Sequence, residues 1–424
     1  MSDRSNVLFV FPDQLGARWT GLGGSDVVET PRLDAFAEEG VTCERAYSNS
    51  PVCTPYRGML LTGRYPSGSG IRDNGDALPD DIPTIADAFA AGGYHLCYVG
   101  KWHIGGAPHE ERWIPPGERG GFEDFVGWQS HHVDHMDGRA WEDAPDEPIE
   151  LDGHETDGLT DIALDRLRSL AGDADRQPFA MFVSYQAPHP PCTPLPEYAE
   201  PYEDRDLIAE PTADADAIYD TWDEELNLQE FRRRYYAEIT HIDDAFGRLL
   251  DVLDDTGLSD DTIVVFTSDH GEMNGCHGLF NKGTFYEESA RVPLAVRGPG
   301  IERGGAIDAP VSAIDLFPTL LDLCDLDPVE PVAGSSFADA LRGTADVDTD
   351  RPHFFEYDDW VGIVRGAQKL LADRSDCSPR ALYDLESDPW EQENRLESAE
   401  EPTIRSLREP LAEWRDDVIA GATE

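Results

Sequence analysis

A cysteine, a proline and an arginine stand close together in the segment Cys53-Thr-Pro-Tyr-Arg57, which has the form Cys-x-Pro-x-Arg. A cysteine is nucleophilic only as its thiolate, and it needs a nearby cation or a helix N-terminus to ionise near neutral pH. If Pro55 opens a helix, Arg57 lies one helical turn from the cysteine. An anion bound there would meet free N–H groups, a helix dipole and a guanidinium together. The spacing fits an anion-handling nucleophile, and about equally a buried structural cysteine.

The wider sequence favours the nucleophile. Cys53-Thr-Pro-Tyr-Arg57, followed by Leu61-Thr-Gly-Arg-Tyr-Pro66, resembles the signature of the type I sulfatases. In that family the cysteine is oxidised after translation to formylglycine, whose hydrate attacks sulfur. Many members have Ser where this chain has Tyr56, but the core requirement of the modifying enzyme is intact. The resemblance therefore implies a formylglycine at residue 53 and a formylglycine-generating enzyme as a maturation partner.

Two further polar pairs follow strand-like runs. Asp13-Gln14 comes after residues 6–11, and Asp269-His270 comes after the β-branched run 262–267. Because open α/β sheets bind ligands at the carboxyl ends of their strands, we expect these side chains to meet at one edge. Carboxylate and amide oxygens suit a hard cation, and an imidazole also admits a softer metal. Taken alone, a strand-terminal Asp is more often a cap or turn residue.

The resemblance implies that these four residues bind one divalent metal, with Ca²⁺ favoured and Mn²⁺ or Mg²⁺ as alternatives. The commoner family pattern is Asp-Asp in the first pair and Asp-Asn in the second. Asp-Gln and Asp-His also occur in the superfamily, including some phosphonate and phosphate ester hydrolases. The metal therefore stays open, and a phosphonate monoester or phosphodiester hydrolase stays an alternative function.

Two lysines and two histidines extend the resemblance. Lys101 and His103 in Gly-Lys-Trp-His, together with Lys282, match family positions that hold the sulfate group and handle protons. Fixed cations suit a sulfuryl group, because its transition state carries spread negative charge. His189, in Ala-Pro-His-Pro-Pro, resembles the family histidine that protonates the leaving oxygen, a role suited to a pKa near neutrality. Weaker candidates for substrate contact are Arg72, Asn74 and His277.

The composition is strongly acidic. Asp and Glu number 86 against 33 Lys and Arg, which gives a net charge of −53, and the only lysines are Lys101, Lys282 and Lys369. Dispersed acid with few lysines resembles adaptation to molar salt, as in halophilic archaea. No basic stripe is available to neutralise phosphates, so nucleic acid is excluded as a partner. An anionic substrate is compatible, because about 1 M salt reduces the Debye length to about 3 Å.

The cysteines and the apolar segments bear on the cellular compartment. Seven scattered cysteines form neither a dense disulfide framework nor Cys-x-x-Cys zinc spacing. The first residues lead into a strand-like run without the charged and apolar regions of a signal peptide. No apolar run reaches the roughly 18 residues that span a bilayer. We expect a soluble, cytoplasmic protein without a membrane partner.

The chain alternates strand-like and helix-like segments, which predicts a mostly parallel α/β sheet covered by helices. Expected strands are 6–11, 94–100, 179–185, 262–267 and 292–296, and expected helices are 31–40, 83–92, 156–170, 228–255 and 314–323. Residues 104–150 and 193–226 have the composition of surface loops. After about residue 345, short strands at 353–357, 360–364 and 381–385 precede a helix near 403–419. We predict a catalytic domain, 1–345, and a smaller antiparallel-sheet subdomain, 346–424.

Taken together, the resemblance implies the fold of the alkaline-phosphatase superfamily and a sulfatase acting on a sugar or aryl sulfate monoester. Cys53, Arg57, Lys101, His103, His189 and Lys282 are the expected catalytic residues. A non-catalytic binding protein is the alternative if Cys53 is not oxidised. The sequence does not predict the oligomeric state or the physiological substrate.

Overall fold

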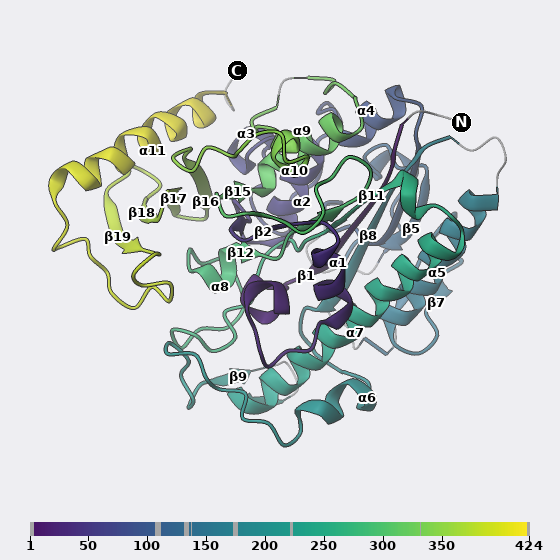
Figure 1. Ribbon diagram of the computed structural model, residues 1–424, viewed down its shortest axis with the longest axis horizontal. Helices are drawn as coiled ribbons and strands as arrows, with labels where there is room; N and C mark the ends of the chain where they lie inside the picture. Colours follow the sequence, from purple (N-terminus) through teal and green to yellow (C-terminus); the bar gives the residue numbers. More distant parts are fainter. Residues whose placement is uncertain are drawn as a thin grey trace.

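The computed structural model describes residues 4–106, 112–130, 135–136, 138–172, 177–220, 224–330 and 332–421. Its centre is an eight-stranded sheet (Figure 1). In spatial order the strands are β14 (Gly305–Ile307), β2 (Val41–Cys43), β13 (Ala295–Arg297), β11 (Thr262–Phe266), β1 (Asn6–Asp13), β8 (Phe179–Pro188), β4 (His95–Lys101) and β5 (Asp124–Trp128). Of these eight described strands, β13 alone runs against the others. The α/β prediction is therefore confirmed.

The sheet is buried on both faces, and the alternation along β1 shows why. Leu8 and Val10 point into one core, whereas Val7, Phe9 and Phe11 point into the other. Three helices line the first core: α1 (Pro31–Glu38), α5 (Glu155–Gly172) and α7 (Leu228–Asp255). Three line the second: α2 (Cys53–Thr62), α4 (Ile85–Ala91) and α9 (Ala313–Leu323). Figure 1 shows α5 and α7 on one side of the strands and α2 and α9 on the other.

The longest helix, α7, has the predicted bounds. Asn227 caps it, because its side chain accepts the N–H of Glu230. Its buried stripe includes Ile239, Phe246 and Leu253, which pack in the first core. The helix α4 begins with a capping box between Thr84 and Asp87. Local signals therefore fix both helices where the sequence predicts them.

A four-stranded antiparallel sheet forms most of the C-terminal region. Its strands are β16 (His353–Tyr357), β17 (Trp360–Arg365), β18 (Gln368–Asp373) and β19 (Pro379–Asp384), in that order. The helix α11 (Glu401–Gly421) packs Leu407 and Leu411 onto this sheet. The predicted smaller antiparallel sheet and final helix are confirmed, and β18 is a strand that the sequence interpretation omits.

Two expectations need correction. The composition of residues 104–150 predicts surface loops, but β5 lies within them and adds a strand to the edge of the central sheet. The side chains of β5 are buried, as Phe125, Val126 and Trp128 show. The sequence does not reveal this strand, because it is one short apolar run between segments of loop-like composition. The strand expected at 292–296 is divided between two sheets, as β12 (Arg291–Val292) and β13. Part of each expected loop lies outside the described residues.

The remaining strands and α-helices are short. They are β3 (Ala46–Tyr47), β15 (Val311–Ser312), β6 (Arg139–Ala140), β7 (Ile149–Glu150), β9 (Ile218–Asp220), β10 (Glu225–Asn227), α3 (Pro66–Ser69), α6 (Pro196–Ala199), α8 (Glu287–Ala290) and α10 (Ala338–Leu341). All seven cysteines are free and buried. Within the described ranges, no helix has the length and apolar character needed to cross a membrane.

Candidate active site

The carboxyl ends of four parallel strands bring the predicted residues together. Asp13 ends β1, Lys101 ends β4, His189 follows β8 and Asp269 follows β11. These strands are neighbours in the order β11-β1-β8-β4, and they run in the same direction. Their following residues therefore share one edge of the sheet, as the topology of open α/β folds requires.

Cys53 enters this edge as the first residue of α2. The preceding Val52 is extended, Pro55 lies in the first turn, and every residue of the helix is buried. The Thr54 backbone N–H donates to Asn74 Oδ1 at 3.2 Å, and the Thr54 hydroxyl donates to the His103 carbonyl at 2.6 Å. The start of α2 is therefore tied to two other predicted site segments.

The Cys53 thiol faces an imidazole and a carboxylate. Sγ lies 3.2 Å from His270 Nε2 and 3.5 Å from Asp13 Oδ1. His270 Nδ1 lies 2.9 Å from the Gly271 carbonyl, which can only accept, so Nδ1 carries the proton. Burial lowers the pKa of His270, which keeps the ring neutral. The Nε2 lone pair therefore faces Cys53 and is available to a metal.

Asp13 and Asp269 are fully buried beside one another. Asp269 Oδ1 accepts the backbone N–H groups of Gln14 and His270, each at 2.9 Å. Burial and the nearby Asp13 charge raise the pKa of Asp269 to about 7. Ligand atoms of Asp13, Cys53, Asp269 and His270 all lie within 4.8 Å of one another. Two adjacent buried carboxylates with an imidazole nitrogen fit a divalent cation, whose charge would favour both ionised acids.

Gln14 adds a fifth polar group, and a neighbouring acid orients it. Its φ of +72° is a left-handed conformation, which is uncommon for a residue with a side chain. The Gln14 amide Nε2 donates to Glu272, so the amide oxygen faces the other way and accepts from Lys282 Nζ at 2.6 Å. Glu272 Oε1 in turn accepts backbone N–H groups of Asn274 and Asn281. Glu272 therefore fixes which Gln14 atom faces the site.

Two cations lie deep in the site. Lys101 Nζ is 2.8 Å from Asp13 Oδ2, and Arg57 Nη2 is 3.3 Å from the same oxygen and 3.4 Å from Asp269 Oδ2. Arg57 also donates to the Lys101 carbonyl at 2.7 Å and to Ser184 Oγ at 2.8 Å. Its guanidinium is thus held from several sides, which makes it a fixed positive charge rather than a mobile one.

The two histidines that are predicted to transfer protons, His103 and His189, differ in their surroundings. Burial, together with the charges of Lys101 and Arg57, holds the pKa of His103 well below its ordinary value, so its ring is neutral. His189 Nδ1 lies 2.6 Å from the Pro190 carbonyl and therefore carries a proton. His189 keeps 8% of its surface exposed, against 1% for His103. His189 is therefore the less buried of the two histidines.

Comparison with known proteins identifies the family of the chain. The sulfatase family model matches residues 5–326, and the model of the C-terminal region of N-sulphoglucosamine sulphohydrolase matches residues 275–417. The chain belongs to the sulfatase family. It is therefore a sulfuric ester hydrolase with the sulfatase fold.

Individual relatives extend over almost the whole sulfatase chain. An ulvan-active sulfatase of Formosa agariphila is 32% identical, covering 98% of this chain and 82% of the relative. A choline-sulfatase of Rhizobium meliloti is 31% identical, covering 97% and 86%. The crystal structure of the putative sulfatase yidJ from Bacteroides fragilis superposes with a TM-score of 0.88 at 27% identity, covering 100% of this chain and 98% of that one.

The weaker substrate candidates of the sulfatase are placed differently from one another. Asn74 contacts the first turn of α2 through Thr54, the residue after Cys53. Arg72 is exposed, and its backbone N–H donates to Asp76. His277 stacks on Tyr286 with ring centroids 3.9 Å apart, and burial lowers the pKa of its ring although Asp388 opposes this shift. The structure thus brings Asn74 to the site and places the His277 ring against Tyr286.

Sequence reasoning missed several supporting residues. Tyr98 donates its hydroxyl to the Lys101 carbonyl at 2.6 Å, and Ser184 accepts from Arg57. Tyr98 lies on β4 and Ser184 on β8. In a strand sequence, such an inward-facing residue cannot be told from an ordinary core residue. Glu272 was detectable, because it stands only three residues after Asp269 in the same motif.

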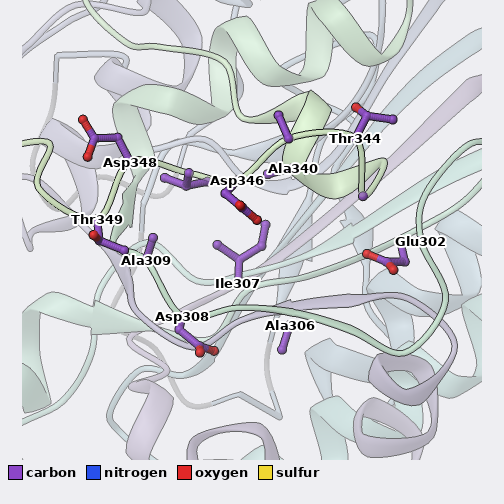
Figure 2. A pocket seen from close by; sticks show the side chains of 13 residues that line it. Glu302, Ala306, Ile307, Asp308, Ala309, Ala340, Thr344, Asp346, Asp348 and Thr349 are labelled. Carbon is purple, nitrogen blue, oxygen red and sulfur yellow. The ribbon is translucent and has the colours of Figure 1, made fainter.

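A large hollow lies away from these residues. It has a volume of about 850 Å³ and is lined by Glu302, Asp308, Asp346 and Asp348 among others (Figure 2). The described residues that line it include neither Lys nor Arg. Four carboxylates without a cation repel a sulfate group, so this hollow does not suit the substrate.

Proposed function

We propose that this sulfatase hydrolyses a sulfate monoester of a saccharide or an aryl alcohol, with formylglycine at residue 53 as its nucleophile. The observation that carries the proposal is the position of Cys53 Sγ, at the buried start of α2 and 3.5 Å from Asp13 Oδ1. In the mature enzyme the reactive oxygen of the modified residue would take the place of Sγ. Hydrated formylglycine supplies a hydroxyl group that attacks sulfur.

The proposed metal ligands are Asp13, Gln14, Asp269 and His270, with Ca²⁺ favoured and Mn²⁺ or Mg²⁺ as alternatives. The convergence of oxygen and nitrogen atoms on one point supports this assignment. A divalent ion there supplies positive charge that lowers the pKa of a neighbouring hydroxyl group and stabilises sulfuryl oxygens. The Gln14 oxygen is turned toward the site by its bond to Glu272.

The remaining steps fall to side chains of this chain. Lys101, Arg57 and Lys282 hold the negative charge that spreads over the sulfuryl oxygens. His189 gives a proton from its second ring nitrogen to the leaving alcohol. His103, which is neutral, then accepts a proton from the modified residue 53 and helps to release sulfate. The buried cations support the first role, and the low pKa of His103 supports the last.

The substrate class rests on the relatives. Similar proteins are named an ulvan-active sulfatase, an N-acetylglucosamine-6-O-sulfatase and an arylsulfatase. The proposal therefore includes both saccharide and aryl sulfate monoesters. Gln14 and His270 favour a second candidate on the same scaffold, a phosphonate monoester hydrolase.

The test begins with maturation. The chain is produced together with a formylglycine-generating enzyme, and the peptide containing residue 53 is examined by mass spectrometry. We expect the formylglycine mass in wild type and no turnover in Cys53→Ala, with an unchanged circular dichroism spectrum. Unmodified Cys53 in fully active protein would contradict the proposal. Parallel assays with aryl sulfate and aryl phosphonate monoesters separate the two candidates by their kcat/KM.

A further inference from the structure

A second group of metal-ligating side chains lies apart from the Cys53 site. His135, His154 and Glu238 each offer one ligand atom, and these atoms all lie within 4.8 Å of one another. They come from three parts of the chain: a loop residue, the residue before α5, and the middle of α7. All three side chains have no solvent exposure. Burial of a carboxylate is costly unless a cation or hydrogen bonds compensate for it.

The distances within this group indicate how the buried Glu238 carboxylate is compensated. His135 Nδ1 is 3.4 Å from Glu238 Oε1, and His154 Nε2 is 3.3 Å from Glu238 Oε2. A charge-assisted hydrogen bond would bring these atoms to about 2.7–2.9 Å. Moreover, among the described residues neither His154 Nε2 nor Glu238 Oε2 has a hydrogen-bond partner, although both are buried. Two ligands at about 2.0–2.1 Å from a tetrahedral zinc ion lie about 3.3 Å apart, which matches the observed spacing.

We propose that His135, His154 and Glu238 bind a second divalent ion, of the Zn²⁺ class, at a site separate from Cys53. Two imidazoles and one carboxylate form a donor set typical of zinc and unlike the all-oxygen sets of Ca²⁺. Glu238 directs one carboxylate oxygen at each histidine, Oε1 at His135 and Oε2 at His154.

His154 must change one contact when the ion binds. Its Nδ1 lies 3.2 Å from the Thr156 backbone nitrogen, which donates to it. A bond from Nε2 to a metal requires the ring proton on Nδ1, so this long contact opens on binding. Ion binding therefore exchanges a weak helix-capping contact at the start of α5 for a metal bond.

The site would also support the turn that carries His189. Glu238 Oε1 accepts the Thr193 backbone N–H at 3.0 Å, and the Cys192 thiol donates to the Pro188 carbonyl at 3.4 Å. The segment 188–193 is thus held directly against Glu238. A metal on this carboxylate would fix the position of the proposed proton donor without touching the substrate.

The test measures zinc content in a background that disables the Cys53 site, namely Cys53→Ala with Asp269→Asn. After equilibration with Zn²⁺ and dialysis, elemental analysis should find one zinc per chain. His154→Gln and Glu238→Gln should each remove it. The matched control is His241→Gln, whose ring centroid is 4.6 Å from that of His154 but whose nitrogen pairs with Asp157. That variant should keep its zinc.

Spectroscopic measurements distinguish zinc loss caused by a missing ligand from zinc loss caused by misfolding. Co²⁺ in place of zinc should give visible absorption from a site with nitrogen ligands in the background protein and in His241→Gln. Circular dichroism should show that His154→Gln and Glu238→Gln remain folded. Zinc retained at one equivalent in folded His154→Gln, or no zinc in the background protein, would overturn the proposal.

Discussion

Lys101 Nζ lies 2.8 Å from Asp13 Oδ2, and neither side chain is exposed to solvent. The two residues end strands β4 and β1, which are separated in the sheet by β8. The ion pair between Lys101 and Asp13 therefore crosses the end of β8, the strand that lies between them. Burial alone would lower the pKa of Lys101, but the nearby Asp13 charge raises it. The ammonium therefore stays charged at every pH of interest.

Replacing Lys101 with Arg should reduce kcat by about a hundredfold. The ammonium is compact and can turn toward both Asp13 and a sulfuryl oxygen, whereas a guanidinium is wider and its donors are fixed in a plane. In a site that already holds Arg57, this width should displace the substrate, and about 1 Å of misplacement can cost roughly that factor. Steady-state kinetics on an aryl sulfate measures the change, with formylglycine verified in both proteins. Wild-type kinetics in Lys101→Arg would show that Lys101 does not contact the reacting group.

The variant Glu272→Gln should weaken metal binding about 10- to 100-fold. Glu272 Oε1 accepts two backbone N–H groups, so the amide nitrogen of the variant must face Gln14. Gln14 would then have to turn its own oxygen toward residue 272 and its nitrogen toward the metal. Titration calorimetry with Ca²⁺ or Mn²⁺ measures the loss.

The double variant Gln14→Glu with Glu272→Gln is the matched control. A carboxylate at position 14 can accept from the amide introduced at position 272 and still direct an oxygen at the site. Metal affinity should therefore recover relative to Glu272→Gln alone. If the double variant bound metal as weakly as the single variant, the orientation of Gln14 would not be the cause.

Much of the site was predictable because its residues stand in contiguous motifs at strand ends. Asp13 follows a plainly apolar run, and the rule for open α/β sheets places it with Asp269 without knowledge of the fold. The strand β5 was not predictable in this way, because its burial depends on pairing with β4, a separate segment of the chain. The group around Glu238 was hidden for the same reason. Its members come from three segments, and one of them, Glu238, resembles any other acid on a charged helix.

Salt should stabilise the protein. The net charge is −53, so the many acidic side chains repel one another at low ionic strength. About 1 M salt shortens the Debye length to about 3 Å and screens this repulsion. The melting temperature should therefore rise when KCl is increased from low to molar concentration. Sucrose at equal osmolality is the control, because it favours compact states without screening charge. An equal effect of both solutes would contradict the electrostatic explanation.

Acid should destabilise the fold in part through His353. Burial lowers the pKa of this residue on β16 to about 3, well below the value of about 6.5 for an exposed histidine. Between these values the unfolded chain binds a proton that the folded chain does not. Stability is therefore lost as pH falls below about 6.5, by up to about 1.4 kcal/mol per pH unit. Urea unfolding at pH 6.5 and 5 should show a smaller loss in His353→Gln, and an equal loss in both proteins would contradict this assignment.

Lys369, the third lysine, should prove structural. Its Nζ lies 2.8 Å from Glu287 Oε1 and 2.9 Å from Glu391 Oε1, so the lysine joins strand β18 to helix α8 and to the loop after β19. All three side chains are nearly or wholly buried, so Lys369→Met leaves two buried acids without their cation. Breaking such a pair typically costs about 3–5 kcal/mol. Urea unfolding should show a loss of this size.

A surface arginine of the same sheet gives the comparison for Lys369. Arg380 pairs with Asp359 and Asp373, and its side chain is one-third exposed, at 33%. Exposed pairs contribute about 0–1 kcal/mol, so Arg380→Met should change stability little. Adding Glu391→Gln to Lys369→Met should recover part of the loss, because it removes one of the two unpaired charges. If Lys369→Met were as stable as Arg380→Met, the buried ion group would contribute nothing to holding the C-terminal sheet.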